Sequence, residues 1–169
     1  MSHSQMALSK VPDDESNLKP LYVESLTLVE RLHRRMLDLV KDEFDHTNLY
    51  NVNSAQALLL FNIGESEMAA SELKTRGCYL GSNVSYNLKK LTAMEYLHHE
   101  RSLLDRRSAR VRLTAKGREI AAIVNGLYER HIKWISGVES VLALEDIDTI
   151  RNSLRRLDRF LNDQVLYRL

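Results

Sequence analysis

The residues best suited to direct contact with a ligand lie between positions 80 and 117. The first part of this segment carries hydroxyl, amide and ammonium groups that can bond to base edges or phosphates. These side chains are Ser82, Asn83, Ser85, Tyr86 and Lys89. The last part carries four arginines around one turn, Arg106, Arg107, Arg110 and Arg112. Guanidinium groups match phosphates and narrow grooves better than ammonium groups do. The segment therefore predicts a DNA-binding protein.

Charge is distributed unevenly along the chain. The 24 Lys and Arg and the 23 Asp and Glu leave a formal net charge of +1. Residues 71–118, however, contain eleven Lys and Arg against four Asp and Glu, a local net charge of +7. Such a basic segment concentrates the attraction for a polyanion. A solvated charged surface without a partner is the alternative, and it is the commoner case for an arbitrary basic run.

Apolar residues at helical spacing would position the first part of the segment. Four of them fall on one face of a helix, namely Leu80, Val84, Leu88 and Leu91. Ser82 would cap this helix, which would run to about Met94. On the opposite face, Asn83 can pair with adenine or a phosphate and Tyr86 can contact thymine methyl groups. An ordinary exposed polar face explains this helix equally well, and the arginines that follow favour DNA binding.

After Tyr96, apolar and polar residues alternate instead of recurring at helical spacing. In Ala109–Leu113 the apolar side chains face one way and Arg110 and Arg112 face the other, as in a half-buried strand. Residues 97–101 are the expected partner strand. The sequence therefore predicts a hairpin with basic residues on its outer face.

The turn of this hairpin contains Asp105, Arg106 and Arg107. We expect the Asp105 carboxylate to orient one arginine, while Arg106 or Arg107 enters the minor groove or contacts a phosphate. Lysines and glutamates would serve equally well if these residues only kept the surface soluble. The turn is therefore predicted to contact DNA beside the helix.

Helices are predicted on both sides of the central segment, because both prolines lie within the first twenty residues. The expected helices span about residues 21–47, 54–64, 71–77, 82–94, 114–135 and 144–161. Asn53 or Ser54 would cap the second helix and Thr114 the fifth. The positions expected to be buried in the fifth helix are Ile120, Ile123, Val124, Leu127, His131, Ile132 and Ile135.

The terminal helical regions carry apolar stripes that the small central segment cannot cover. We expect them to cover each other across a homodimer, although packing within one chain is an alternative. A dimer also suits a DNA-binding protein of this size, because one recognition helix contacts few base pairs. The expected organisation is a flexible amino terminus at 1–19, a helical dimerisation region at 20–52 and 118–169, and a DNA-binding domain at 53–117.

Several other function classes lack their signatures. The sequence contains no Gly-rich phosphate loop, no His-Glu-x-x-His and no Gly-x-Ser-x-Gly, so we expect neither an enzyme nor a cofactor. His98 and His99 would point to opposite sides of a strand, which argues against a joint metal site. One cysteine excludes an internal disulfide. No apolar run reaches the roughly 20 residues of a membrane span, and no signal peptide is seen, so we expect a cytoplasmic protein.

The order of these elements resembles the MarR (multiple-antibiotic-resistance regulator) family of winged-helix transcription factors. The resemblance spans about residues 20–166, and its specific part is Asp105-Arg106-Arg107-Ser108 followed by Leu113-Thr114-Ala115-Lys116-Gly117. It implies a mainly α fold with a small β-hairpin wing, a winged helix-turn-helix with long terminal dimerisation helices. Where many members have a glycine before the first wing strand, this chain has Glu95, so a helix could run further there.

The resemblance further implies a homodimer on palindromic double-stranded DNA, with Arg106 or Arg107 as the wing contact. Ser82, Asn83, Ser85, Tyr86 and Lys89 would lie on the groove-reading helix. It also implies that small aromatic or phenolic ligands, or cysteine oxidation, release the DNA.

Two forms of regulation can be placed on residues of this chain. An apolar cleft for an aromatic effector could be lined by Phe44, Thr47, Phe61 and Tyr79. The alternative is that these side chains only fill the core.

Cys78 lies between Gly77 and Tyr79, where a reactive thiol could displace the recognition helix. An unpaired cysteine is more often a small buried hydrophobe. A winged-helix module that binds protein instead of DNA is the remaining alternative, and it would need an exposed apolar patch.

Overall fold

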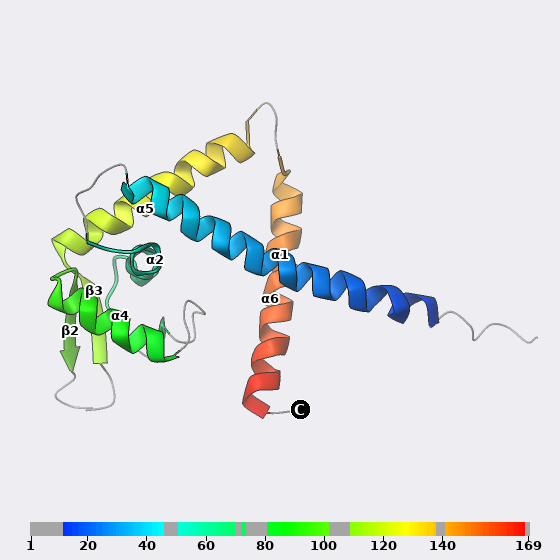
Figure 1. The fold of residues 1–169 in the computed structure, drawn as a ribbon, viewed down its shortest axis with the longest axis horizontal. Helices are drawn as coiled ribbons and strands as arrows, with labels where there is room; N and C mark the ends of the chain where they lie inside the picture. Colours follow the sequence, from blue (N-terminus) through cyan, green and yellow to red (C-terminus); the bar gives the residue numbers. More distant parts are fainter. Residues whose placement is uncertain are drawn as a thin grey trace, which may run out of the picture. The chain divides into compact units, whose positions relative to one another are not determined.

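The computed structural model describes residues 12–45, 51–69, 72–73, 81–101, 109–137 and 141–167. The chain divides into two compact units, Met1–Ala121 and Ala122–Leu169. Figure 1 shows the order of the helices and strands along the chain. The first unit contains α1 (Pro12–Asp45), α2 (Ser54–Ile63), β1 (Met68–Ala69), α4 (Gly81–Ala93), β2 (Leu97–Arg101), β3 (Ala109–Leu113) and the first turns of α5 (Ala115–Ile135). The second contains the rest of α5 and α6 (Leu144–Tyr167). The predicted class, mainly α with a small β-hairpin wing, is confirmed.

Helix α1 begins at Pro12, well before the predicted start at Leu21, and it continues through Pro20. An internal proline removes one backbone donor and crowds the preceding turn, which is why the sequence favoured a later start. The flexible segment predicted at 1–19 is therefore wrong for residues 12–19, which are helical. At its other end, Val40 and Phe44 are buried, and α1 packs on α2.

Helix α2 has well-defined caps at both ends. Asn53 is the N-cap, and it forms a reciprocal capping box with Gln56. Gly64 follows the helix with φ 69°, in the left-handed region that favours glycine. The predicted end of this helix near Gly64 is confirmed, and of the two candidate caps the structure selects Asn53.

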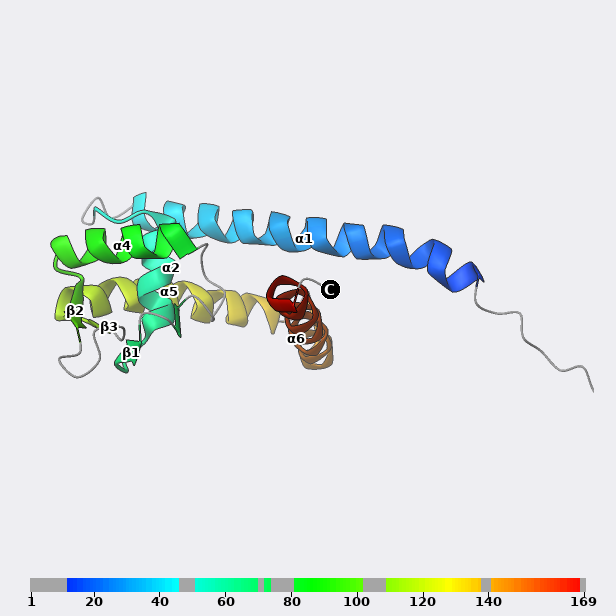
Figure 2. The ribbon, with the colours of Figure 1, turned by 90° about the horizontal axis from the view of Figure 1, so that it is seen from below.

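The sheet has three antiparallel strands in the order β1-β3-β2. Leu97 pairs with Leu113 and His99 with Val111, so the predicted hairpin of 97–101 with 109–113 is confirmed. The strand β1 was not predicted, because a two-residue strand is too short to show alternation. It pairs with the outer edge of β3 through Met68 and Val111 (Figure 2).

The core of the first unit is formed by α2, which is buried on nearly all sides, together with one face each of α4 and the sheet. Helix α2 packs on β3, and α4 packs on β2. Fully or almost fully buried side chains here include Leu59, Leu60, Leu73, Val84, Leu91, Tyr96, Val111 and Ile120. Helix α4 and the sheet, which belong to the basic segment, thus pack on one continuous apolar core.

The last turns of α5 and most of α6 leave large apolar side chains exposed. In α5, Val124 and Leu127 are buried as predicted, but Ile132 is 63% exposed, so its predicted burial is wrong for the single chain. In α6, the apolar stripe predicted from the sequence consists of Ile147, Ile150, Leu154, Leu157 and Leu161. It remains largely uncovered, because Leu157 is half-buried and the other four are each between 38% and 46% exposed. Within the described residues, no helix is long and apolar enough to cross a membrane.

The turn between α4 and β2 is closed by Glu95, whose φ is 63°. Helix α4 ends at Ala93, one residue from the predicted end at Met94, and it does not run further at Glu95. The backbone N–H of Glu95 donates to the Thr92 carbonyl at 3.0 Å, which closes the turn. The left-handed conformation crowds Cβ against the following carbonyl, and a glycine avoids this cost.

We expect Glu95→Gly to raise the free energy of unfolding by about 1 kcal/mol, because it removes the left-handed strain. Chemical denaturation measures the change. The matched control is Ala122→Gly, at an exposed position inside α5, which should lower stability by about 0.5–1 kcal/mol. A loss of stability in Glu95→Gly would show that residue 95 does not adopt this conformation in solution.

Candidate nucleic-acid interface

Helix α4 has one buried and one exposed face. Val84, Leu88 and Leu91 are at most 4% exposed, whereas Ser85, Tyr86 and Lys89 are exposed, Tyr86 by 65%. The predicted division of this helix is therefore confirmed for its described side chains. The helix begins at Gly81, so Ser82 lies in its first turn instead of capping it. Hydroxyl side chains are also suited to the first turn, where backbone N–H groups remain free.

The edge of α4 next to its outward face carries Asn87, which is half-buried. The Oδ1 of Asn87 accepts a hydrogen bond from Nε2 of Gln56 on α2 at 3.1 Å. Gln56 is 1% exposed, and its Oε1 accepts the backbone N–H of Asn53 at 3.1 Å. Sequence reasoning missed Gln56. Only the spacing of Asn53 and Gln56, which fits a capping box, could have pointed to it.

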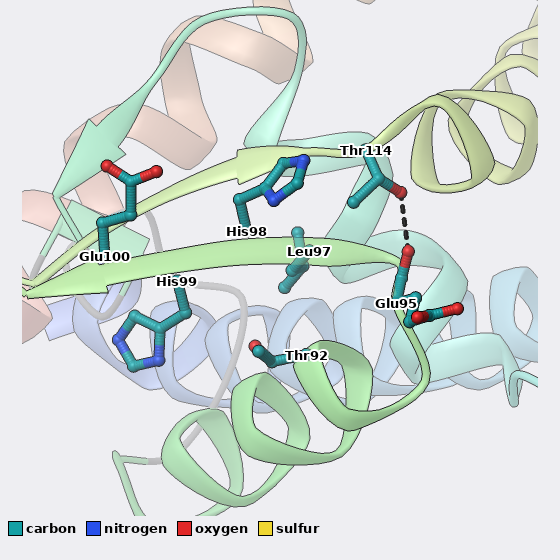
Figure 3. A pocket seen from close by; sticks show the side chains of 7 residues that line it. All are labelled: Thr92, Glu95, Leu97, His98, His99, Glu100 and Thr114. Carbon is teal, nitrogen blue, oxygen red and sulfur yellow. Dashed lines mark hydrogen bonds between the residues drawn. The ribbon is translucent and has the colours of Figure 1, made fainter.

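The junction of α4, β2 and α5 is held by Thr114, the predicted cap of α5. Its Oγ1 accepts the N–H of Gly117 at 3.0 Å and donates to the carbonyl of Glu95 at 2.8 Å (Figure 3). The backbone N–H of Thr114 donates to the carbonyl of Tyr96 at 3.2 Å. These bonds position the start of the wing, defined here as residues 97–113, against α4.

A pocket of about 400 Å³ lies beside β2 at this junction. It is lined by Thr92, Glu95, Leu97, His98, His99, Glu100 and Thr114 (Figure 3). His98 and His99 point to opposite sides of β2, as predicted from strand alternation (Figure 3). Among the described residues there is no group of three or more His, Cys, Asp or Glu that could hold a metal ion.

The outward face of the sheet carries two ion pairs. Arg110 Nη1 lies 3.3 Å from Oε1 of Glu67, and Arg112 Nη2 lies 3.5 Å from Oε1 of Glu100. All four side chains are at least 44% exposed, so solvent screens both pairs. Arg110 therefore lies on the outer face as predicted, but its charge is shared with Glu67, a partner that sequence reasoning did not identify.

Several predicted site residues lie outside the described part of the chain. These are Arg106 and Arg107 in the wing turn, Cys78, and the proposed ligand-contacting residues Thr47 and Tyr79, together with the side chains of Ser82 and Asn83. Of the other two predicted ligand-contacting residues, Phe44 is buried and Phe61 is half-buried.

Comparison with known proteins assigns the central part of the chain. Residues 52–117 match the family model of a winged helix DNA-binding domain. The chain is also similar to the exopolysaccharide II synthesis transcriptional activator ExpG of Rhizobium meliloti, with 42% identity over 101 residues. This match covers 60% of the chain and 52% of ExpG, so the chain spans about half the length of that curated relative.

Solved structures match over most of the chain. FabT from Streptococcus pneumoniae, solved in complex with DNA, has a TM-score of 0.62 and 21% identity, and the match covers 84% of this chain and 98% of FabT. MarR from Staphylococcus aureus, in complex with salicylate and kanamycin, has a TM-score of 0.64 and 20% identity, covering 88% and 97%. A MarR variant from E. coli with operator DNA has a TM-score of 0.59 and 16% identity, covering 78% and 91%.

The structural likenesses establish the fold, and residues 52–117 match a winged helix DNA-binding domain. The chain therefore has a winged-helix fold like that of the solved MarR structures. The fold implied by the resemblance is thus confirmed, and the relative ExpG is described as a transcriptional activator.

Proposed function

We propose that this chain is a sequence-specific DNA-binding transcription regulator that acts as a homodimer on a pseudo-palindromic operator. The observation that carries the proposal is the exposed face of α4, where Ser85, Tyr86 and Lys89 lie opposite a fully buried apolar face. An exposed polar helix on a rigid support can enter the major groove and bond to base edges. The alternative of protein binding would need apolar side chains there, and Tyr86 is the only large one that α4 exposes among its described side chains.

Roles within the proposed interface follow from position and chemistry. The DNA-binding domain would comprise residues 53–117. In it, Ser82, Asn83, Ser85, Tyr86 and Lys89 would contact bases and the nearest phosphates. Arg106 or Arg107 would enter the minor groove or contact a phosphate. Arg110 would contribute to the attraction of phosphates. To contact a phosphate directly, it would have to leave its ion pair with Glu67.

The homodimer would form through residues 20–52 and 118–169. Large apolar side chains are exposed along both terminal helices, with Leu21 and Leu32 at 60% and 66% in α1 and the α6 stripe described above. Exposed apolar surface of this extent on helices is typical of an interface. A second copy of the chain is the favoured occupant, because two copies would supply the twofold symmetry that a palindromic operator requires.

Selection of bound sequences from a random duplex library tests the whole proposal. The expected motif has two half-sites centred about one helical turn, roughly 10–10.5 base pairs, apart. The affinity should fall steeply with salt, because phosphate contacts release counterions. A monomer at micromolar concentration, or binding that does not depend on salt, would contradict the proposal.

Base reading and backbone contact can be separated by two substitutions. Tyr86→Ala should cost about 1–3 kcal/mol of binding free energy at particular base pairs, whereas Arg107→Ala should weaken binding to most sequences and lower the salt slope. Affinities over an operator library, measured at several salt concentrations, provide the comparison. A uniform loss in both variants would exclude base reading by α4.

Regulation by a small aromatic or phenolic molecule is the remaining part of the proposal. A ligand held near Phe44, Thr47, Phe61 and Tyr79 would change DNA affinity only by its differential affinity for the free and DNA-bound states, typically about 1–3 kcal/mol of coupling. Calorimetry of aromatic acids and phenols with and without operator measures this coupling, and Phe61→Ala should weaken it. Equal ligand affinity in both states would favour regulation through Cys78 oxidation instead.

A further inference from the structure

The hydrogen bonds around Gln56 determine which way its amide points. Its Oε1 accepts the backbone N–H of Asn53 at 3.1 Å. A backbone N–H can only donate, so the oxygen of Gln56 must face Asn53. The amide nitrogen must then face the other way, toward α4. Gln56 is 1% exposed, so its own amide group is shielded from water.

The orientation of Gln56 in turn determines that of Asn87. The Nε2 of Gln56 donates to Oδ1 of Asn87 at 3.1 Å. An amide nitrogen cannot accept, so Asn87 must present its oxygen to Gln56 and direct Nδ2 away from it. Among the hydrogen bonds formed within the described residues, none uses this Nδ2. Asn87 is half-buried and lies next to the exposed Tyr86.

The chemistry of this amide selects its partner. An asparagine that reads adenine uses its oxygen and its nitrogen together, but the oxygen of Asn87 is already occupied by Gln56. The two N–H groups of Asn87 Nδ2 therefore remain available as donors at the edge of α4. Phosphate oxygens are suitable partners because they accept hydrogen bonds and cannot donate them. The edges of a helix in the major groove lie toward the two backbones, where contacts position the protein.

We propose that Asn87 donates a hydrogen bond from Nδ2 to a backbone phosphate of bound duplex DNA. Gln56 is the positioning residue that fixes the Asn87 amide in the donating orientation. This inference rests on the proposed DNA binding. It adds a contact that sets how deeply α4 enters the groove, and it predicts that this contact does not depend on base sequence.

The decisive variant is Asn87→Asp. Its carboxylate can still accept from Gln56 Nε2, so the bond to α2 and the melting temperature should be preserved. The outward donor is lost and a negative charge faces the phosphate, so affinity should fall by about tenfold or more. The loss should be similar on the selected operator and on a duplex of mixed sequence. The charge-matched control is Lys19→Gln, at an exposed position outside the proposed DNA-binding and dimerisation regions, which should bind both duplexes with little change.

A phosphate scan separates direct contact from a purely structural role. A series of operator duplexes, each with one phosphate replaced by neutral methylphosphonate, is titrated with the natural chain and with Asn87→Asp. When the contacted phosphate of a half-site is neutralised, the difference in DNA affinity between the two proteins should shrink severalfold. When any other phosphate is neutralised, this difference in affinity should persist. A difference that stays constant at every position would overturn the contact.

The positioning role is tested with Gln56→Met, which retains length and removes both hydrogen bonds. This variant should bind DNA severalfold more weakly, and neutralising the same phosphate should affect it less than the natural chain. An unchanged phosphate profile in a folded variant would overturn the role of Gln56. If Gln56→Met does not fold, the phosphate profile of Gln56→Glu is measured in its place.

If the natural chain binds no duplex, the proposed function fails. If it binds and Asn87→Asp binds equally well, only this inference fails.

Discussion

Replacing Gly117 by alanine is expected to lower the free energy of unfolding by about 2–3 kcal/mol or more. A Cβ at this position would lie 2.2 Å from the carbonyl oxygen of Tyr96. That oxygen belongs to the backbone and accepts the N–H of Thr114 at 3.2 Å, so it cannot move away without breaking the junction between β2 and α5. The substitution would therefore displace the first turn of α5 or the start of the wing.

The second helical glycine of α5 provides a matched control. A Cβ on Gly126 would meet only the Nη1 of Arg130, at an ordinary 3.6 Å. Gly126→Ala should therefore raise stability by about 0.5–1 kcal/mol, because alanine favours the helix interior. If the close approach at Gly117 exists, denaturant titration should give changes of opposite sign in the free energy of unfolding of the two variants. Two stabilising substitutions would mean that α5 and β2 are further apart.

Placing charge on the α6 stripe is expected to abolish specific DNA binding. In the double variant Ile150→Glu and Leu154→Glu, two side chains that are 46% and 43% exposed in the single chain become carboxylates. If a second copy covers them, burying these charges is too costly and the dimer dissociates. A monomer holds one half-site only, so operator affinity should fall on the order of 1,000-fold, toward the non-specific level.

Sedimentation and operator titration measure the two effects together. Arg156→Gln is the control, because it lies on the opposite side of α6 from the stripe, shifts the charge in the same direction and should remain dimeric. The double variant is expected to retain its helical content, since neither side chain is buried in the single chain. A double variant that stays dimeric would place the interface elsewhere.

Local periodicity was enough to predict most elements of this chain. The spacing of Val84, Leu88 and Leu91 predicted which face of α4 is buried, because side chains three or four residues apart share one face of a helix. Alternation in Ala109–Leu113 predicted β3 and the outward direction of Arg110. Thr114 was predicted as a cap from its type and its place before a helical pattern.

The errors arose where a local preference was outweighed. Pro20 disfavours a helix interior, yet α1 extends through it. Glu95 is not a residue that favours φ 63°, yet the bonds at the junction hold the turn in that conformation. Strand β1 has two residues and exists only because the edge of β3 offers unpaired backbone groups.

Sequence alone thus determined the helices, the hairpin, the apolar faces and the residue types available for DNA contact, because these depend on neighbours within a few positions. Tertiary structure alone decided which polar groups meet. Arg110 and Glu67 are 43 residues apart in sequence, and Gln56 and Asn87 are 31 apart. The need for glycine at position 117 likewise depends on the carbonyl of Tyr96. Such contacts leave no periodic signal, because each depends on how two separate elements pack.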